Sequence, residues 1–193
     1  MSGDVALPGF ADPVSEAQAT FRAVLDAMAR PGRLHQIGTR LTPPLPLDQA
    51  TAAVLLTLVD GETPLWLDEA ATAAREWLAF HCGAAVVGSL GRAVFAVALS
   101  LPDMADLPAG SHEAPEESAT LILQVTALDA GVRYRLSGPG LREPASFTVA
   151  GLPADFVKLW HHNHARYPRG VDLILCAGSM LAALPRSVSI EEA

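Results

Sequence analysis

Asp172 is the residue whose surroundings most require a chemical explanation. It lies near the start of an apolar run, residues 171–176, which is bounded by turn-forming residues on both sides. A carboxylate within an apolar strand must be paired, hydrogen-bonded or reached by water. Arg169 and Arg186 flank the run and are its nearest candidate partners. The alternative is that Asp172 only accepts hydrogen bonds from backbone amides of the Pro-Arg-Gly turn, a common role for a carboxylate beside a turn.

Three histidines, His161, His162 and His164, form a second candidate cluster. On a helix, His161 and His164 stand three residues apart and share a face, a spacing that can bind a metal ion. No third ligand lies nearby, and the glutamate of an H-E-x-x-H metalloprotease motif is absent. Histidines near the end of a helix also interact favourably with the helix dipole. We favour this second interpretation and predict no metal site.

The sequence contains no recognisable catalytic set. There is no G-x-S-x-G nucleophile elbow, and Cys82 and Cys176 lie far apart in apolar or helix-end settings without a designated base. Gly138, Pro139 and Gly140 do not form a phosphate loop, because the proline lacks an amide and no Lys-Ser/Thr pair follows. We therefore predict no catalytic residue.

Composition limits the classes of partner. The chain has 193 residues, a formal net charge of -8 and no run of basic residues. Nucleic acids and anionic membranes both attract basic surfaces, so neither is an expected partner. The first residues lack the basic and apolar regions of a signal peptide, and no apolar run approaches the roughly 20 residues that span a bilayer. We expect a cytoplasmic protein with one domain over residues 1–193.

Arginine dominates the cationic side chains. Of 13 basic residues only Lys158 is a lysine. Biased codon usage and phosphate binding are the two explanations of this excess. We prefer codon usage.

Apolar periodicity predicts four helices. The first opens at a capping box formed by Ser15 and Gln18, buries one apolar face and ends before Pro31. The second begins at Asp48, the third runs between Asp68 and Gly83, and the last covers residues 154–164. The apolar face of the first helix is expected to consist of Phe21, Val24, Leu25 and Met28.

Short apolar runs predict strands, and the two near the end of the chain, residues 171–176 and 180–184, predict a buried hairpin. A polar segment over residues 102–118 predicts a surface loop. Hairpin and crossover connections are both implied, so the expected architecture is α/β, a mixed sheet flanked by helices. The other predicted strands cover residues 33–37, 64–67, 84–87, 93–99, 119–125 and 132–136.

Five segments follow one another along nearly the whole chain: F-R-A-V-L-D-A-M-A-R-P-G (21–32), V-L-L-T-L-V-D-G-E-T-P-L-W-L (54–67), A-T-L-I-L-Q-V (119–125), Y-P-R-G-V-D-L-I-L (167–175) and L-A-A-L-P-R (181–186). None is a chemical motif alone, but their joint occurrence is specific. Together they resemble the PhnH family, subunits of the bacterial carbon-phosphorus lyase core complex.

The resemblance implies a fold similar to the large domain of pyridoxal-phosphate-dependent transferases, without that cofactor. It also implies a homodimer that joins PhnG, PhnI and PhnJ. With PhnG, PhnI and PhnL, such a subunit supports transfer of ribose triphosphate from ATP to an alkylphosphonate, giving ribose 1-methylphosphonate 5-triphosphate. Within the matching segments, Arg30, Asp172 and Arg186 are the residues we predict to bind a ligand, a phosphonate or the phosphate of a nucleotide.

The lysine content tests the cofactor expectation separately. A pyridoxal enzyme holds its aldehyde as a Schiff base on a lysine. The sole lysine, Lys158, is predicted within a helix between Phe156 and Trp160 rather than on a loop after a strand. We therefore expect no pyridoxal phosphate and no other cofactor.

Two functional hypotheses remain at this point. The first is a non-catalytic or accessory subunit of the phosphonate-processing complex. The second is a stand-alone small-molecule enzyme with an arginine-lined cleft and, in one version, a histidine-bound metal.

Overall fold

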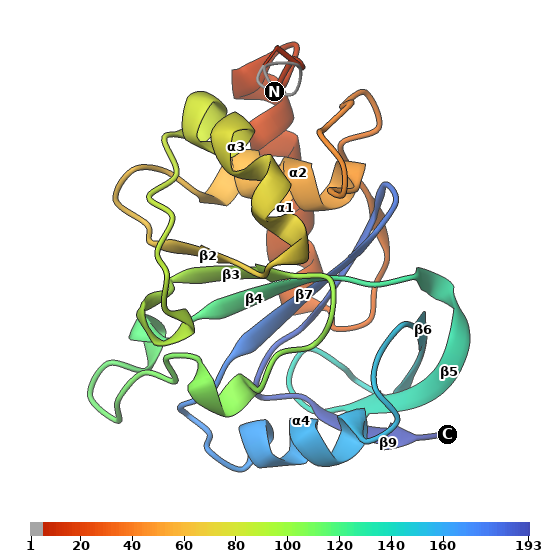
Figure 1. Ribbon diagram of the computed structural model, residues 1–193. Helices are drawn as coiled ribbons and strands as arrows, with labels where there is room; N and C mark the ends of the chain where they lie inside the picture. Colours follow the sequence, from red (N-terminus) through yellow and green to blue (C-terminus); the bar gives the residue numbers. More distant parts are fainter. Residues whose placement is uncertain (1–5) are drawn as a thin grey trace.

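The computed structural model describes residues 6–193 and has a six-stranded mixed sheet with helices on both faces (Figure 1). Helices α1, α2 and α3 cover one face, and α4 lies on the other together with a second, smaller sheet (Figure 1). The α/β class with a mixed sheet is thereby confirmed. The helices are α1 (Pro13–Ala29), α2 (Gln49–Leu58), α3 (Arg75–Cys82) and α4 (Phe156–His164).

The large sheet has the order β1-β8-β7-β4-β3-β2. Strands β2, β3, β4 and β7 are parallel, whereas β8 is antiparallel to both β7 and β1. Its strands are β1 (His35–Gln36), β2 (Leu65–Leu67), β3 (Phe95–Ala98), β4 (Thr120–Gln124), β7 (Asp172–Ala177) and β8 (Met180–Leu184).

The smaller sheet is antiparallel with the order β6-β5-β9, and the sequence did not predict it. Its strands are β5 (Ala127–Ser137), β6 (Ala145–Ala150) and β9 (Ser189–Glu192). The residues 129–131, whose composition is typical of a turn, lie inside β5 at an irregularity of its pairing with β6. Similarity to the large domain of pyridoxal-phosphate-dependent transferases stays a prediction.

Two apolar cores lie on the two faces of the large sheet. Ile122 and Ile174 point to the core under α1, α2 and α3, whereas Leu121 and Leu173 point to the core under α4 and the smaller sheet. Alternate residues of the central strands are therefore buried on both sides, as in parallel sheets covered by helices. No helix within residues 6–193 is long and apolar enough to cross a membrane.

The predicted hairpin near the end of the chain is confirmed. Strands β7 and β8 pair from Leu173–Leu184 to Ala177–Met180 across a tight turn. The predicted strand at residues 84–87 is wrong, because Val86 forms only an isolated bridge to Leu65 of β2.

Helix α1 begins three residues earlier than its predicted capping box. Asp12 is the N-cap residue, its Oδ1 accepts a hydrogen bond from the N–H of Ser15 (3.2 Å), and the N–H of Asp12 donates to Glu16 Oε1 (2.9 Å). Pro13 occupies the first helical position, where a missing N–H costs nothing. The reciprocal cap exists, but its partners are Asp12 and Glu16.

The predicted apolar face of α1 is wrong in part. Val24 is buried as expected, but Phe21 and Leu25 are 46% and 52% exposed. Met28 is partly buried against the core as expected, and the remainder of the buried face consists of Val24 with the smaller Thr20 and Ala27. Small side chains on this face allow the helix to approach its neighbours, and larger apolar side chains are left on the outer face.

Two glycines with left-handed backbones give a matched test of how closely the chain at Gly38 packs against α2. Gly38 has φ 65°, and a Cβ there would lie 2.5 Å from the carbonyl oxygen of Gln49. Gly178 has φ 56° with open space around it. We expect Gly178→Ala to lower the free energy of unfolding by about 1–2 kcal/mol through backbone strain. Gly38→Ala should cost roughly 1–3 kcal/mol more because of the overlap. Urea denaturation measures both, and equal losses would contradict the assigned packing.

Candidate functional site

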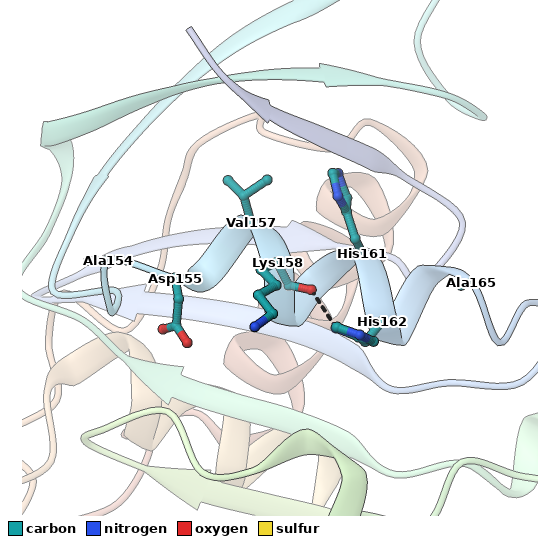
Figure 2. A pocket seen from close by; sticks show the side chains of 7 residues that line it. All are labelled: Ala154, Asp155, Val157, Lys158, His161, His162 and Ala165. Atoms are coloured by element: carbon teal, nitrogen blue, oxygen red, sulfur yellow. Dashed lines mark hydrogen bonds between the residues drawn. The ribbon is translucent and has the colours of Figure 1, made fainter.

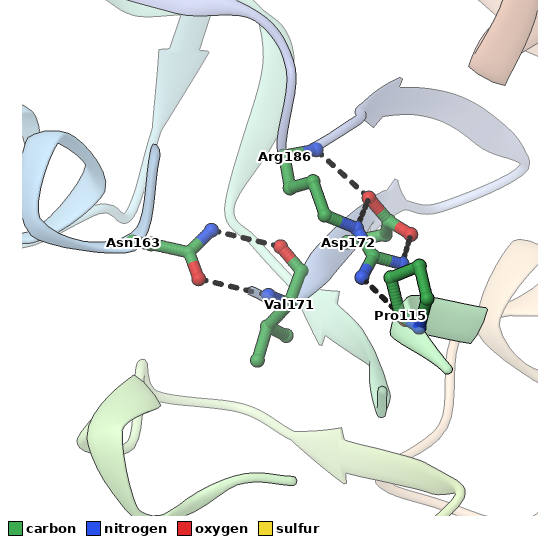
Figure 3. A network of polar contacts seen from close by, with 5 residues as sticks. All are labelled: Pro115, Asn163, Val171, Asp172 and Arg186. Atoms are coloured by element: carbon green, nitrogen blue, oxygen red, sulfur yellow. Dashed lines mark hydrogen bonds and ion pairs between the residues drawn. The ribbon is translucent and has the colours of Figure 1, made fainter. Parts of the chain in front are cut away.

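Asp172 is paired with Arg186 in a nearly buried network (Figure 3). Arg186 Nη2 donates to Asp172 Oδ2 at 2.6 Å, while its Nε and its backbone N–H donate to Oδ1 at 3.1 and 2.8 Å. The two side chains are only 15% and 14% exposed. Pairing with Arg186, one of the two expected partners, is confirmed. Within residues 6–193 the turn before β7 donates no hydrogen bond to this carboxylate.

The network around Asp172 joins four segments of the chain. Arg186 Nη1 also donates to the carbonyl oxygen of Pro115 (2.9 Å), in the 102–118 loop. Beside it, the side chain of Asn163 in α4 exchanges two 2.8 Å hydrogen bonds with the backbone of Val171 (Figure 3). The polar groups at the start of β7 are therefore satisfied by the protein itself, and their immediate role is to hold β7, β8, α4 and the loop together.

This network lies at the less usual edge of the sheet for a ligand. Asp172 is the first residue of β7 and is paired with Thr120, the first residue of the parallel β4. In open α/β sheets, ligands generally bind beyond the carboxyl ends of the parallel strands. The position of Asp172 thus favours a structural role.

Arg30 belongs to a separate charged cluster at the end of α1. It is ion-paired with Asp26, whose carboxylate also lies 3.2 Å from Arg33 Nη1 and 3.1 Å from His35 Nε2. Two residues after Arg30, the N–H of Gly32 donates to a carbonyl of β8 (3.3 Å). The cluster therefore lies beside β8, with His35 opposite Leu181 of that strand. No ion pair or hydrogen bond joins Arg30 to the Asp172–Arg186 pair in the portion that the structure describes.

The three predicted ligand-binding residues thus differ in accessibility. The Arg30 side chain is 56% exposed, whereas Asp172 and Arg186 are nearly buried against each other. Their role in binding a ligand stays a prediction.

The charged cluster perturbs His35. Burial, followed by the positive charges of Arg33 and Arg30, lowers the pKa of His35 below 6.5. The nearby carboxylate of Asp26 acts in the opposite direction, since an anion favours the protonated ring. Burial and the two arginines dominate, because Asp26 is already neutralised by its ion pairs with them.

The three histidines of α4 bind backbone carbonyls rather than one another. Nε2 of His161 lies 2.9 Å from the carbonyl oxygen of Ile190, and Nδ1 of His164 lies 2.8 Å from that of Arg186. These contacts tie α4 to β9 and to the segment that precedes it. His162 Nδ1 lies 2.9 Å from the carbonyl oxygen of Lys158, four residues earlier (Figure 2). Each carbonyl accepts a hydrogen bond, so each of these ring nitrogens carries a proton and is not available to a metal ion.

Two shallow cavities lie along α4 and meet at His162. One, of about 620 Å³, is lined by Asp155, Lys158 and His161 (Figure 2). The other, of about 540 Å³, lies between α4 and the short helix η3 (Met104–Asp106), with Asp103 and Arg166 on its walls. Each cavity combines cationic groups with a carboxylate. They could receive a polar ligand, but no group in them is positioned as a nucleophile with its base.

The carboxyl edge of the sheet contains a polar network that sequence reasoning missed. Gln124, the last residue of β4, accepts hydrogen bonds at Oε1 from the N–H of Asp48 (2.7 Å) and the hydroxyl of Thr51 (2.8 Å). Its Nε2 donates to the carbonyl oxygen of Pro46, and Asp48 Oδ2 accepts from the N–H of Gly178. The loop before α2 is thereby fixed across the ends of β4 and β7, and only a glutamine ending an otherwise apolar strand could have signalled it.

The two cysteines do not supply a nucleophile. Burial raises the pKa of Cys82 to about 11 and that of Cys176 to about 12. Because the thiolate is the reactive form, both side chains are protonated and inert at neutral pH.

The two ion pairs predict different costs when their arginines are replaced. Arg186→Met leaves a nearly buried carboxylate without its partner and should lower the free energy of unfolding by about 3 kcal/mol. Arg30→Met removes an exposed pair from a carboxylate that keeps Arg33, and should cost less than about 1 kcal/mol. Urea denaturation at pH 7 compares the two variants. A loss for Arg186→Met as small as that for Arg30→Met would contradict the structural role of the Asp172–Arg186 pair.

The lowered pKa of His35 implies that the folded protein loses stability on acidification. Because its pKa is lowered in the folded protein, the unfolded chain binds a proton first as pH falls below 6.5, and folding stability is lost from there down to the folded pKa. We expect the free energy of unfolding of His35→Gln, relative to that of the wild type, to rise as the pH falls from 7.5 to 5.5. In an NMR titration, Arg33→Met should raise the pKa of His35, and an unchanged value would refute the contribution of Arg33.

Comparison with known proteins places the chain in a family. Residues 8–191 match the family described as bacterial phosphonate metabolism protein (PhnH). The chain is 40% identical over 187 residues to the alpha-D-ribose 1-methylphosphonate 5-triphosphate synthase subunit PhnH of Rhizobium meliloti (strain 1021), covering 94% of each protein. It is 30% identical over 174 residues to the putative C-P lyase subunit protein HtxG of Stutzerimonas stutzeri, covering 90% of this chain and 85% of that protein. The chain therefore belongs to the PhnH family.

Proposed function

We propose that this chain is a subunit of a bacterial carbon-phosphorus lyase core complex. With PhnG, PhnI and PhnL it supports transfer of ribose triphosphate from ATP to an alkylphosphonate, giving ribose 1-methylphosphonate 5-triphosphate. The observation that carries this proposal is the 40% identity, over 94% of both proteins, to a named subunit of that synthase.

The geometry favours an accessory rather than a catalytic role within such a complex. The thiols are protonated at neutral pH, the histidines of α4 bind backbone carbonyls, and Asp172 and Arg186 satisfy each other. The proposal includes a homodimer of one-domain chains, residues 1–193, that associates with PhnG, PhnI and PhnJ in the cytoplasm.

A ligand-binding role of the charged residues forms part of the same proposal. Arg30 and the neighbouring Arg33 are more than half exposed and could bind a phosphonate or a nucleotide phosphate without disturbing the core. Arginine suits such ligands because its planar group donates two parallel hydrogen bonds. For Arg186, by contrast, an anion would have to replace Asp172.

A stand-alone small-molecule enzyme is the second candidate. The cavities along α4, with Lys158, His162 and Arg166 on their walls, are the observation that favours it.

Co-expression with PhnG, PhnI and PhnJ of the same organism separates the two proposals. We expect one joint peak in size-exclusion chromatography, and no turnover of ATP plus methylphosphonate by the purified chain alone. Metal analysis of that sample should find no stoichiometric metal. Separate elution of all four proteins, or product formation by the isolated chain, would contradict the subunit proposal.

A further inference from the structure

The outer face of α1 carries an apolar stripe. Val14, Phe21 and Leu25 are 70%, 46% and 52% exposed. Their spacing of seven and four residues places them on one side of the helix, because 3.6 residues complete a turn. The stripe follows most of α1, which spans roughly 25 Å at 1.5 Å per residue.

The neighbouring side of α1 is buried in the protein's own core. Thr20, Val24 and Ala27 are at most 6% exposed, in a helix that packs on α2 and β8. Phe21 and Val24 stand three residues apart, so the stripe and the buried side adjoin on the helix surface. The apolar surface of α1 is therefore wider than the part that the protein's own core covers.

The exposed charges of α1 and of the turn after it are mostly cationic. Arg22 is exposed, and the side chains of Arg30 and Arg33, at the end of the helix, are 56% and 57% exposed. Asp12, at the start of the helix, is the exposed carboxylate among these residues, whereas Glu16 and Asp26 are only 13% and 26% exposed and are ion-paired with arginines. In a chain of net charge -8, the stripe is thus accompanied by three accessible arginines.

We propose that the outer face of α1 binds a companion subunit of the complex, through an element whose exposed apolar side chains are flanked by carboxylates. This inference rests on the proposed function. Apolar side chains at the centre with arginines at the rim match the general anatomy of protein interfaces. Acidic groups on the partner would neutralise Arg22, Arg30 and Arg33 and orient the two surfaces.

Charge also argues against a second copy of this chain as the occupant. In a two-fold contact the same patch meets itself. Phe21 is the middle residue of α1 (Pro13–Ala29), so two antiparallel copies would bring both Arg22 side chains close to the axis. Like charges placed together oppose association. A partner with carboxylates has no such cost.

The experiment compares exposed phenylalanines of two helices in the co-expressed complex. Phe21→Glu and Leu25→Glu change the stripe, whereas Phe80→Glu changes a phenylalanine of α3 that is 69% exposed. Each variant of the full chain is co-expressed with PhnG, PhnI and PhnJ, and circular dichroism checks its folding. We expect both α1 variants to reduce association with the companions at least tenfold, and Phe80→Glu to leave it within twofold. Arg22→Glu should weaken association and reduce its dependence on salt.

The possible outcomes separate this inference from the function on which it rests. Folded α1 variants that join the complex at the wild-type level would overturn the inference and leave the subunit function intact. Variants that dissociate a homodimer but remain in the complex would also overturn it, because a second copy would then occupy α1. Failure of the wild-type chain to join any companion would reject the subunit function and the inference together.

Discussion

Burial of β7 on both faces is the constraint on which the rest of the structure depends. Ile174 and Leu173 point into opposite cores, so no water reaches the middle of the strand. The polar groups at its two ends must therefore be satisfied by the protein. At the start, Asp172 binds Arg186, and at the end, the N–H of Gly178 binds Asp48. These contacts fix the hairpin to the 102–118 loop on one side and to the beginning of α2 on the other.

The same constraint limits what the protein can do chemically. Side chains that are catalytic in other proteins act here as hydrogen-bond partners of the backbone, as His161 does between α4 and β9 and His164 between α4 and the segment before β9. Gln124 and Asp48 occupy the carboxyl edge, where open α/β sheets usually bind ligands. Within the part of the chain that the structure describes, the groups that other molecules can contact include those on the outer surfaces of α1 and α4. Contacts of this kind agree with membership of the PhnH family.

The sequence predicted the features that depend on local pattern, namely the mixed sheet and the β7–β8 hairpin, and it offered Arg186 as one of two candidate partners of Asp172. It failed where long-range packing decides. Phe21 and Leu25 have the period of a buried face, but the smaller Thr20 and Ala27 are buried instead. Periodicity identifies an apolar side of a helix but cannot show how much of that side a neighbour covers. The network at Gln124 joins residues more than 70 positions apart, and no local pattern encodes such a contact.

The predicted ligand-binding arginines differ in how easily an incoming anion could displace the carboxylate that each already binds. An anion at Arg186 must displace Asp172, which would leave a nearly buried carboxylate without its charge partner. At Arg30 an anion competes with Asp26, which keeps Arg33 and His35 beside it. The cost of removing the arginine from its carboxylate is therefore small at the end of α1 and large at the start of β7. The exposed arginines at the end of α1 are therefore more accessible to an anion than Arg186 is.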